Sequence, residues 1–160
     1  MIMTIHPHQG VDRIRFRMSR SEVEHAVGTK PKRFKHSEYG PEVDIFAAMD
    51  LTVLYDEDDK VNAITVSPNP DNALEYDGYN LLAHPAREVR GWALAKDPQL
   101  DPKHGFTSKL LGLGMWADWI DEPDLTPDEL QDPAQSFIIF RPGYYEEEQA
   151  RLRAAGLVPG

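Results

Sequence analysis

The chain has 160 residues, of which 41% are hydrophobic and 28% are charged, a composition typical of one globular domain. It contains no cysteine, so disulfides, thiolate catalysis and cysteine-based zinc sites are excluded. The formal net charge of −10 at pH 7 repels nucleic acids and anionic lipid surfaces, and it favours a basic protein as the partner.

The first elements in the chain are predicted to be a strand and a helix. Segment 11–16 alternates apolar and charged residues, which indicates a short strand with one solvated face. Ser19 and Glu22 have the spacing of a capping box, so a helix begins after Ser19. Gly28 ends this helix as a left-handed residue, and segment 29–35 is then expected to be a basic loop.

Three strands are predicted to follow as an antiparallel meander. Segments 43–48, 51–55 and 61–66 are rich in β-branched and aromatic residues. The polar segment 56–60 joins the last two strands and has the length of a hairpin loop. Segment 67–80 contains several Pro, Asn and Gly residues, and it is therefore predicted to be a loop.

The second half is predicted to contain a helix, two strands and a terminal helix. One helix begins at Pro85, because the first turn of a helix does not need the N–H that proline lacks. After a loop at 97–105, segments 109–116 and 135–141 are predicted to be strands. Segment 144–155 is predicted to be a helix, since acids occupy its first turn and arginines lie near its end.

Together these elements predict an α+β fold, in which two or three helices pack on a curved antiparallel sheet. The chain is expected to form a single domain over residues 1–160. Segment 10–66 is its first helix-plus-meander unit, and segment 81–156 is a looser second unit that includes the C-terminal helix.

A recurring bacterial pattern lies within segment 10–66. It consists of Gly10, Ile14-Arg15-Phe16-Arg17-Met18-Ser19, Glu22-Val23, Val27-Gly28 and Leu54-Tyr55-Asp56. This pattern resembles the helix-plus-meander module of the beta-lactamase-inhibitor-protein-like fold, which also occurs in small outer-membrane assembly lipoproteins and in immunity proteins paired with polymorphic toxins. The resemblance implies inhibition by surface occlusion and carries no catalytic residues. Arg17 stands where the pattern has glycine.

The cytoplasm is the expected compartment. The N-terminal segment 1–10 lacks the apolar core of a secretory signal, and the chain has no acylated cysteine, so the lipoprotein branch is disfavoured. No apolar run approaches the roughly 20 residues that a membrane helix needs. We therefore expect neither a membrane nor a nucleic acid among the partners.

The sequence predicts no catalytic residue, no metal site and no cofactor. His6 and His8 lack further ligands at a useful spacing, and they are expected to lie in a partly ordered N-terminal arm. The acids of the predicted hairpin loop lack the central glycine of a calcium loop. No serine has the surroundings of a nucleophile elbow, and no glycine-rich phosphate loop is present.

The candidate contact surface follows from the distribution of charge. Residues 1–37 carry eight Lys and Arg against three acids, a net of +5, which leaves −15 for the rest of a chain with −10. Segment 118–132 has seven acids and no Lys or Arg, and two tryptophans lie at its edge. Because tryptophan dominates interface hot spots, the best candidates are Trp116, Asp118, Trp119, Asp121, Glu122 and Asp124. The alternative is that Trp116 points into the core and that the acids are only solvated.

Two weaker candidate patches complete the prediction. They are Tyr144 and Tyr145 beside the acids of the terminal helix, and Asp56, Asp58 and Asp59 at the hairpin tip. We expect an immunity-type inhibitor that occludes the active site of a cognate basic toxin, such as a nuclease. The alternatives are a small-molecule-binding or enzymatic domain with a pocket near Trp92, and an accessory assembly subunit. The oligomeric state stays open.

Overall fold

The computed structural model describes residues 1–35, 38 and 40–157, which form three α-helices and two mostly antiparallel sheets. The larger sheet has seven strands in the order β10-β11-β12-β7-β6-β5-β4. Its strands, in chain order, are β4 (Lys32–Phe34), β5 (Val43–Phe46), β6 (Leu51–Tyr55), β7 (Val61–Val66), β10 (Gly105–Ser108), β11 (Leu113–Trp116) and β12 (Ser136–Phe140). The predicted α+β class is confirmed.

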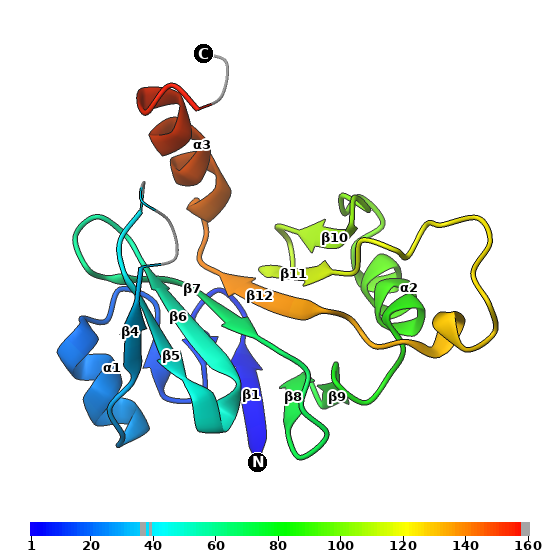
Figure 1. The fold of residues 1–160 in the computed structure, drawn as a ribbon, viewed down its shortest axis with the longest axis horizontal. Coiled ribbons are helices and arrows are strands. Elements are labelled where there is room, and N and C mark those ends of the chain that lie inside the picture. The colour runs from blue at the N-terminus through cyan, green and yellow to red at the C-terminus, as the bar shows by residue number, and fades with distance from the viewer. Residues whose placement is uncertain (36–37, 39, 158–160) are drawn as a thin grey trace.

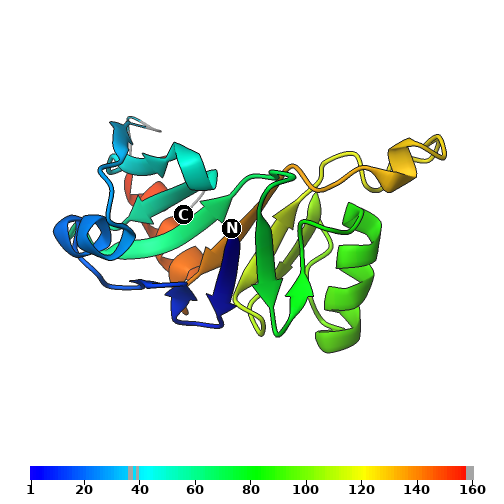
Figure 2. The ribbon, with the colours of Figure 1, turned by 90° about the horizontal axis from the view of Figure 1, so that it is seen from below.

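The smaller sheet has five short strands in the order β3-β2-β1-β8-β9. They are β1 (Ile2–His6), β2 (Gly10–Val11), β3 (Ile14–Arg15), β8 (Ala73–Tyr76) and β9 (Tyr79–Asn80). Helices α1 (Arg20–Val27) and α2 (Ala86–Lys96) lie at opposite ends of this sheet (Figure 2). One buried core joins both sheets to both helices, with Met3, Val23, Ile64, Val89 and Phe137 among its members.

The same order of elements occurs twice along the chain. A hairpin, a helix and antiparallel strands follow one another as β2-β3, α1, β4–β7, and again as β8-β9, α2, β10–β12 (Figure 1). The two sets of strands meet in the middle of the larger sheet, where β12 pairs with β7 from Phe137↔Val66 to Phe140↔Ala63. The β6–β7 hairpin of the first unit therefore corresponds to the β11–β12 connection of the second.

Local signals place several elements as predicted. Ser19 and Glu22 make both hydrogen bonds of the capping box of α1, and Gly28 ends the helix with φ 84°. Strands β6 and β7 have the predicted bounds and are joined by the predicted hairpin. The terminal helix α3 (Tyr144–Ala154) is also confirmed.

Three segments differ from their predictions because turns were missed. Segment 11–16 is a tight hairpin whose turn residue Asp12 has φ 51° and accepts a hydrogen bond from the N–H of Thr4. Segment 67–80 contains the hairpin β8-β9, because Asp77 and Gly78 both take the positive φ of a hairpin turn. Segment 109–116 is not one strand: β11 begins only at Leu113, and β10 precedes it.

Two further segments that were expected to lack regular structure are strands. The N-terminal arm is β1, the middle strand of the smaller sheet, and it pairs with β8 in parallel from Ile2↔Ala73 to Thr4↔Glu75. The basic loop contains β4, which pairs with β5 at the edge of the larger sheet. Strand β4 carries no alternating pattern, whereas residues 3–6 of β1 do alternate apolar and polar side chains, a signal that the prediction overlooked.

Helix α3 is anchored on the sheet by its first turn. Tyr144 is buried in a small second cluster with Ala63 and Phe140, and Tyr145 packs against it. The rest of the helix projects from the body of the molecule (Figure 1). Burial raises the pKa of Tyr144. The proposed contact role of Tyr144 is therefore corrected, because this side chain holds the helix in place.

Candidate protein-binding surface

The strongest of the predicted contact patches lies on the connection between β11 and β12. We call residues 117–135 the acidic lobe. It extends from one end of the molecule, next to α2, and contains the short 3-10 helix η2 (Glu129–Gln131) (Figure 1). The lobe takes the place that a short turn, residues 56–60, takes in the first unit. A long connection at this position is what distinguishes the second unit.

Trp116 is exposed at the base of the acidic lobe. In β11 the side chains of Leu113 and Met115 are buried toward the core, so Trp116 points to the opposite face of the sheet, where 47% of it is exposed. Its indole stacks on His104 with 4.8 Å between ring centroids. The N–H of Ala117 donates to the carbonyl oxygen of His104 at 2.6 Å. The alternative that Trp116 points into the core is therefore wrong.

Trp119 has a different role from Trp116. Its side chain is half-buried and packs against the main core, next to the buried residues Ala117 and Ile120. The prediction placed both tryptophans on one contact surface, whereas the structure exposes mainly Trp116. Trp119 instead attaches the start of the acidic lobe to the domain.

Several contacts fix the acidic lobe to the domain. Arg90 of α2 binds Asp121 with both terminal nitrogens, at 3.1 and 2.8 Å. This contact lowers the pKa of Asp121 below its ordinary value. At the other end of the lobe, the N–H of Ala86 donates to the carbonyl oxygen of Asp132. The lobe is consequently held at both ends.

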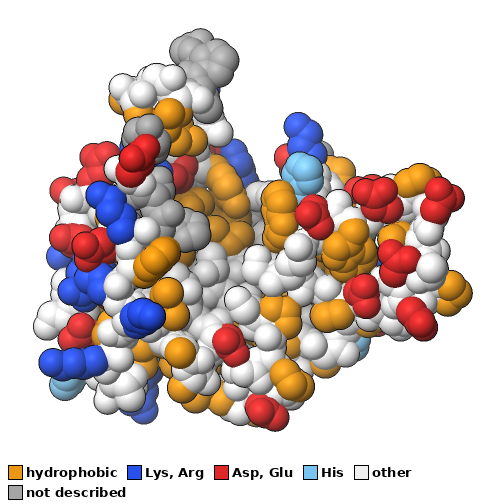
Figure 3. All heavy atoms as spheres, viewed as in Figure 1, with side chains coloured by type: hydrophobic (Ala, Val, Ile, Leu, Met, Phe, Trp, Pro, Cys, Tyr) orange, Lys and Arg blue, Asp and Glu red, His pale blue; other side chains and the backbone are white. Residues whose placement is uncertain are grey.

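The remaining carboxylates of the lobe face solvent. Among the described residues, no ion pair involves the exposed side chains of Asp118, Glu122, Asp124, Asp128 and Asp132. Glu129 is held by a neighbour: its carboxylate accepts a hydrogen bond from the N–H of Thr126, and its own N–H donates to the hydroxyl of Thr126. In Figure 3 the acids of this end surround hydrophobic side chains, while at the opposite end, over α1 and β4, Lys and Arg lie among further acids.

The predicted acids of the β6–β7 hairpin are mostly engaged within the chain. Asp56 accepts hydrogen bonds from the N–H groups of Asp58 and Lys60 and pairs with Arg17. Burial raises the pKa of Asp56, but these donors outweigh burial and hold that pKa below its ordinary value. Asp59 pairs with Arg20 at 3.0 Å. Of the predicted hairpin acids, Asp58 alone is exposed without an ion pair in the described part of the chain.

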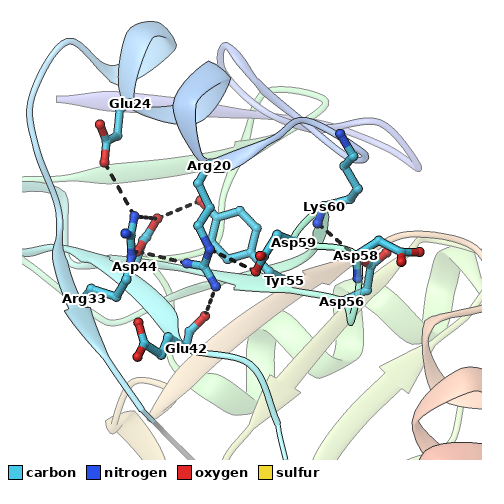
Figure 4. A network of polar contacts seen from close by, with 10 residues as sticks. All are labelled: Arg20, Glu24, Arg33, Glu42, Asp44, Tyr55, Asp56, Asp58, Asp59 and Lys60. Carbon is cyan, nitrogen blue, oxygen red and sulfur yellow. Dashed lines mark hydrogen bonds and ion pairs between the residues drawn. The ribbon is translucent and has the colours of Figure 1, made fainter.

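Sequence reasoning missed a buried carboxylate beneath this hairpin. Asp44 of β5 is fully buried and binds Arg20 at 3.2 Å, Arg33 at 2.8 Å and the hydroxyl of Tyr55 at 2.9 Å (Figure 4). The guanidinium of Arg20 also lies over the ring of Tyr55, 4.0 Å from its centroid. Burial and the contact with Asp44 raise the pKa of Tyr55. This network ties α1, β4 and the hairpin together and has a structural role.

A polar cleft of about 580 Å³ lies between the hairpin and α3. Ion pairs line it, including Arg17 with Asp56 and Arg141 with Glu147, and Arg141 also donates to the buried Asn62. The arginines Arg17 and Arg141 of the cleft thus already have carboxylate partners within the chain. The hairpin and the acidic lobe are on opposite sides of the molecule, so the predicted patches do not form one surface (Figure 1).

Aromatic rings occupy the place beside Trp92 where the alternative function expected a pocket. Trp92 stacks on Tyr79 with 4.7 Å between ring centroids, and it meets Tyr76 edge-on at 5.4 Å, so aromatic rings fill the space beside it. Among the described residues, no three His, Asp or Glu side chains are grouped so that they could hold a metal ion. Within the same residues, no helix has the length and apolar character required to cross a bilayer.

Comparisons with family models, with curated proteins and with solved structures found no match to this chain. The functional assignment therefore depends on the geometry and charge of the acidic lobe and its tryptophan.

Proposed function

We propose that this protein is an immunity-type inhibitor that uses Trp116 and the acidic lobe to bind a basic toxin and occlude its active site. The observation that carries the proposal is the exposed, stacked indole of Trp116 at the base of a lobe with unpaired carboxylates. An accessory assembly subunit would use the same surface for a structural partner, and the inhibition assay below separates the two.

The position of Trp116 supports a binding hot spot. An exposed tryptophan leaves apolar area in water that a partner can cover, and a side chain already held by stacking loses little rotamer freedom on binding. Unpaired carboxylates beside it supply charge for the lysines and arginines of a basic partner. A nuclease fits this chemistry, because its substrate groove is basic and binds phosphates.

The proposal is tested by affinity purification from the cells that produce the protein, using the wild type and Trp116→Ala at low and high ionic strength. We expect the wild type to retain a basic protein at low salt and to lose it as salt rises, because exposed charges are screened. Trp116→Ala should weaken the complex by about 30-fold, the loss of about 2 kcal/mol expected at a hot spot.

The recovered partner is then assayed for its own activity with and without the inhibitor. Inhibition by the wild type and its loss in Trp116→Ala would support the immunity role. Lys103→Ala, which removes a nearby exposed cation, serves as the matched control and should leave inhibition unchanged. Recovery of no stable protein partner, or an affinity that does not change with salt, contradicts the proposal.

The polar cleft is the observation that favours the second candidate, a small-molecule-binding domain. It has a suitable volume of about 580 Å³ and a buried polar residue, Asn62, in its lining. A ligand there must compete with carboxylates of the chain, because Arg17 and Arg141 already form ion pairs with them. We therefore rank this function below protein binding.

A further inference from the structure

The two edge strands of the seven-stranded sheet, β10 and β4, differ in whether backbone hydrogen bonds occupy their outer sides. At the β10 edge, Asp101 forms a bridge with Thr107 through two backbone hydrogen bonds of 2.9 and 2.8 Å. This contact occupies backbone groups that an incoming strand would need. At the β4 edge, no strand of the described residues pairs with the outer side of Lys32–Phe34. The β4 edge is therefore open.

The open edge combines positive charge with an exposed aromatic ring. Lys30, Lys32 and Lys35 are exposed, and none of them forms an ion pair within the described residues. Arg33 is different, because its side chain is engaged by the buried Asp44. The side chain of Phe34 is 51% exposed. This is unusual at a sheet edge, because edges are normally shielded by charged groups, and an exposed apolar side chain there favours pairing with another strand.

We propose that the β4 edge is a second binding site, separate from the acidic lobe, which adds an extended acidic segment of a partner protein as an eighth strand. Backbone hydrogen bonds to β4 would provide the pairing, Phe34 would cover an apolar side chain, and the three lysines would select acidic residues. A second copy of this chain is a poor occupant, because pairing two β4 edges brings lysines against lysines.

The test uses a capped heptapeptide in which one central valine, to face Phe34, is flanked by glutamates on both sides, and a matched peptide with lysines in place of the glutamates. We expect the acidic peptide to bind, to shift the NMR signals of the β4 amides and to slow their hydrogen exchange. Reversing the three charges (K30E, K32E and K35E) should weaken the acidic peptide by about tenfold or more and let the lysine peptide bind. These side chains are exposed, so the variant keeps the fold.

Two controls separate strand addition from simple charge attraction. An acidic peptide with methylated alternate backbone nitrogens keeps its charge but lacks the donors for pairing, and it should not bind. Phe34→Ala should weaken the unmodified peptide while leaving the fold intact. Equal binding of the methylated peptide, absence of binding by the acidic peptide, or dimerisation of the chain through β4 would overturn the proposal. The outcome is independent of Trp116.

Discussion

Arg17 adopts a backbone conformation that glycine takes freely and other residues take at a cost. Its φ is 75°, and its N–H donates to the carbonyl oxygen of Val61, which fixes this conformation at the entrance to α1. The recurring pattern of the first unit has glycine at this position. The chain thus holds a residue other than glycine in the left-handed conformation and places its guanidinium group beside Asp56.

Two substitutions of Arg17 separate the backbone from the side chain. Arg17→Gly and Arg17→Ala both remove the ion pair with Asp56, but only glycine relieves the left-handed conformation. We expect the glycine variant to be more stable than the alanine variant by about 1 kcal/mol. Urea denaturation of both variants measures this difference. An alanine variant as stable as the glycine variant would show that the conformation carries no strain.

The two tryptophans of the lobe should differ in their effect on stability. Trp116→Ala removes an exposed ring and should lower the free energy of unfolding by less than about 1 kcal/mol. Trp119→Ala removes a ring that packs against the core, and the expected loss is about 2 kcal/mol. Urea unfolding of the two variants is the measurement. If Trp116→Ala were the more destabilising change, the assignment of Trp116 to the contact surface would be wrong.

At the scale of elements, the buried Asp44 connects strands and helix around the hairpin. Asp44→Asn keeps the shape of the side chain but removes the charge that Arg20 and Arg33 face, so we expect a loss of about 2 kcal/mol in unfolding free energy. Asp59→Asn, at the exposed end of Arg20, is the control and should change stability little. Equal effects of the two changes in thermal or urea unfolding would contradict the structural role of Asp44.

The attachment of the acidic lobe should depend on pH through Asp121. Arg90 lowers the folded-state pKa of Asp121 below its ordinary value of 3.8, so the pair stabilises the attached lobe above about pH 4. This contribution is lost as the pH falls through the lowered pKa. We expect the protection of the 117–135 amides, measured against their intrinsic exchange rate at each pH, to fall in acid for the wild type. Asp121→Asn should show quick exchange at neutral pH already, and a wild-type lobe unaffected by acid would contradict this view.

Elements with local signals could be predicted from the sequence, and elements defined by distant pairing could not. The cap of α1 and the hairpin between β6 and β7 depend on residues close in the chain. Strand β1 depends on β8, some seventy positions away, and three-residue β4 carries no alternating pattern. The β8-β9 hairpin was a missed signal, because Asp77-Gly78 is a strong hairpin turn sequence.

The candidate surface was predictable in part. The acidic run and the exposed acids beside Trp116 followed from composition, and the outward direction of Trp116 could have followed from its alternation with Leu113 and Met115. The separate role of Trp119 and the network around Asp44 could not, because their partners come from other elements. The same is true of the burial of Tyr144, which depends on the facing strands.

At the scale of the whole molecule, the distribution of charge has a polarity that follows the order of the two units along the chain. The second unit carries the acidic lobe in place of the short hairpin of the first, and the basic first 37 residues include α1 and β4 at the other end (Figures 1 and 3). The acidic lobe, which has seven acids and no Lys or Arg within 118–132, presents one end of the molecule to a basic protein. The two proposed binding sites therefore attract partners of opposite charge.

This polarity predicts how the complex with a basic partner forms and separates. Replacing three exposed acids of the lobe (D118N, E122Q and D124N) should slow association, because steering is lost, and should change dissociation little. Trp116→Ala should act on dissociation, because it removes contact area and not charge. Surface plasmon resonance at two ionic strengths separates the two rates. A triple variant that altered only dissociation would contradict the steering role of the lobe.

The central claim is that the acidic lobe contacts a basic protein, and photo-crosslinking inside the producing cells tests it most directly. A photoreactive residue is placed at Glu122 on the lobe or, as the control, at Ser21 on the exposed side of α1. We predict that position 122 crosslinks one basic protein and that this product disappears when Trp116→Ala is added. No product from position 122, or the same product from position 21, would contradict the account.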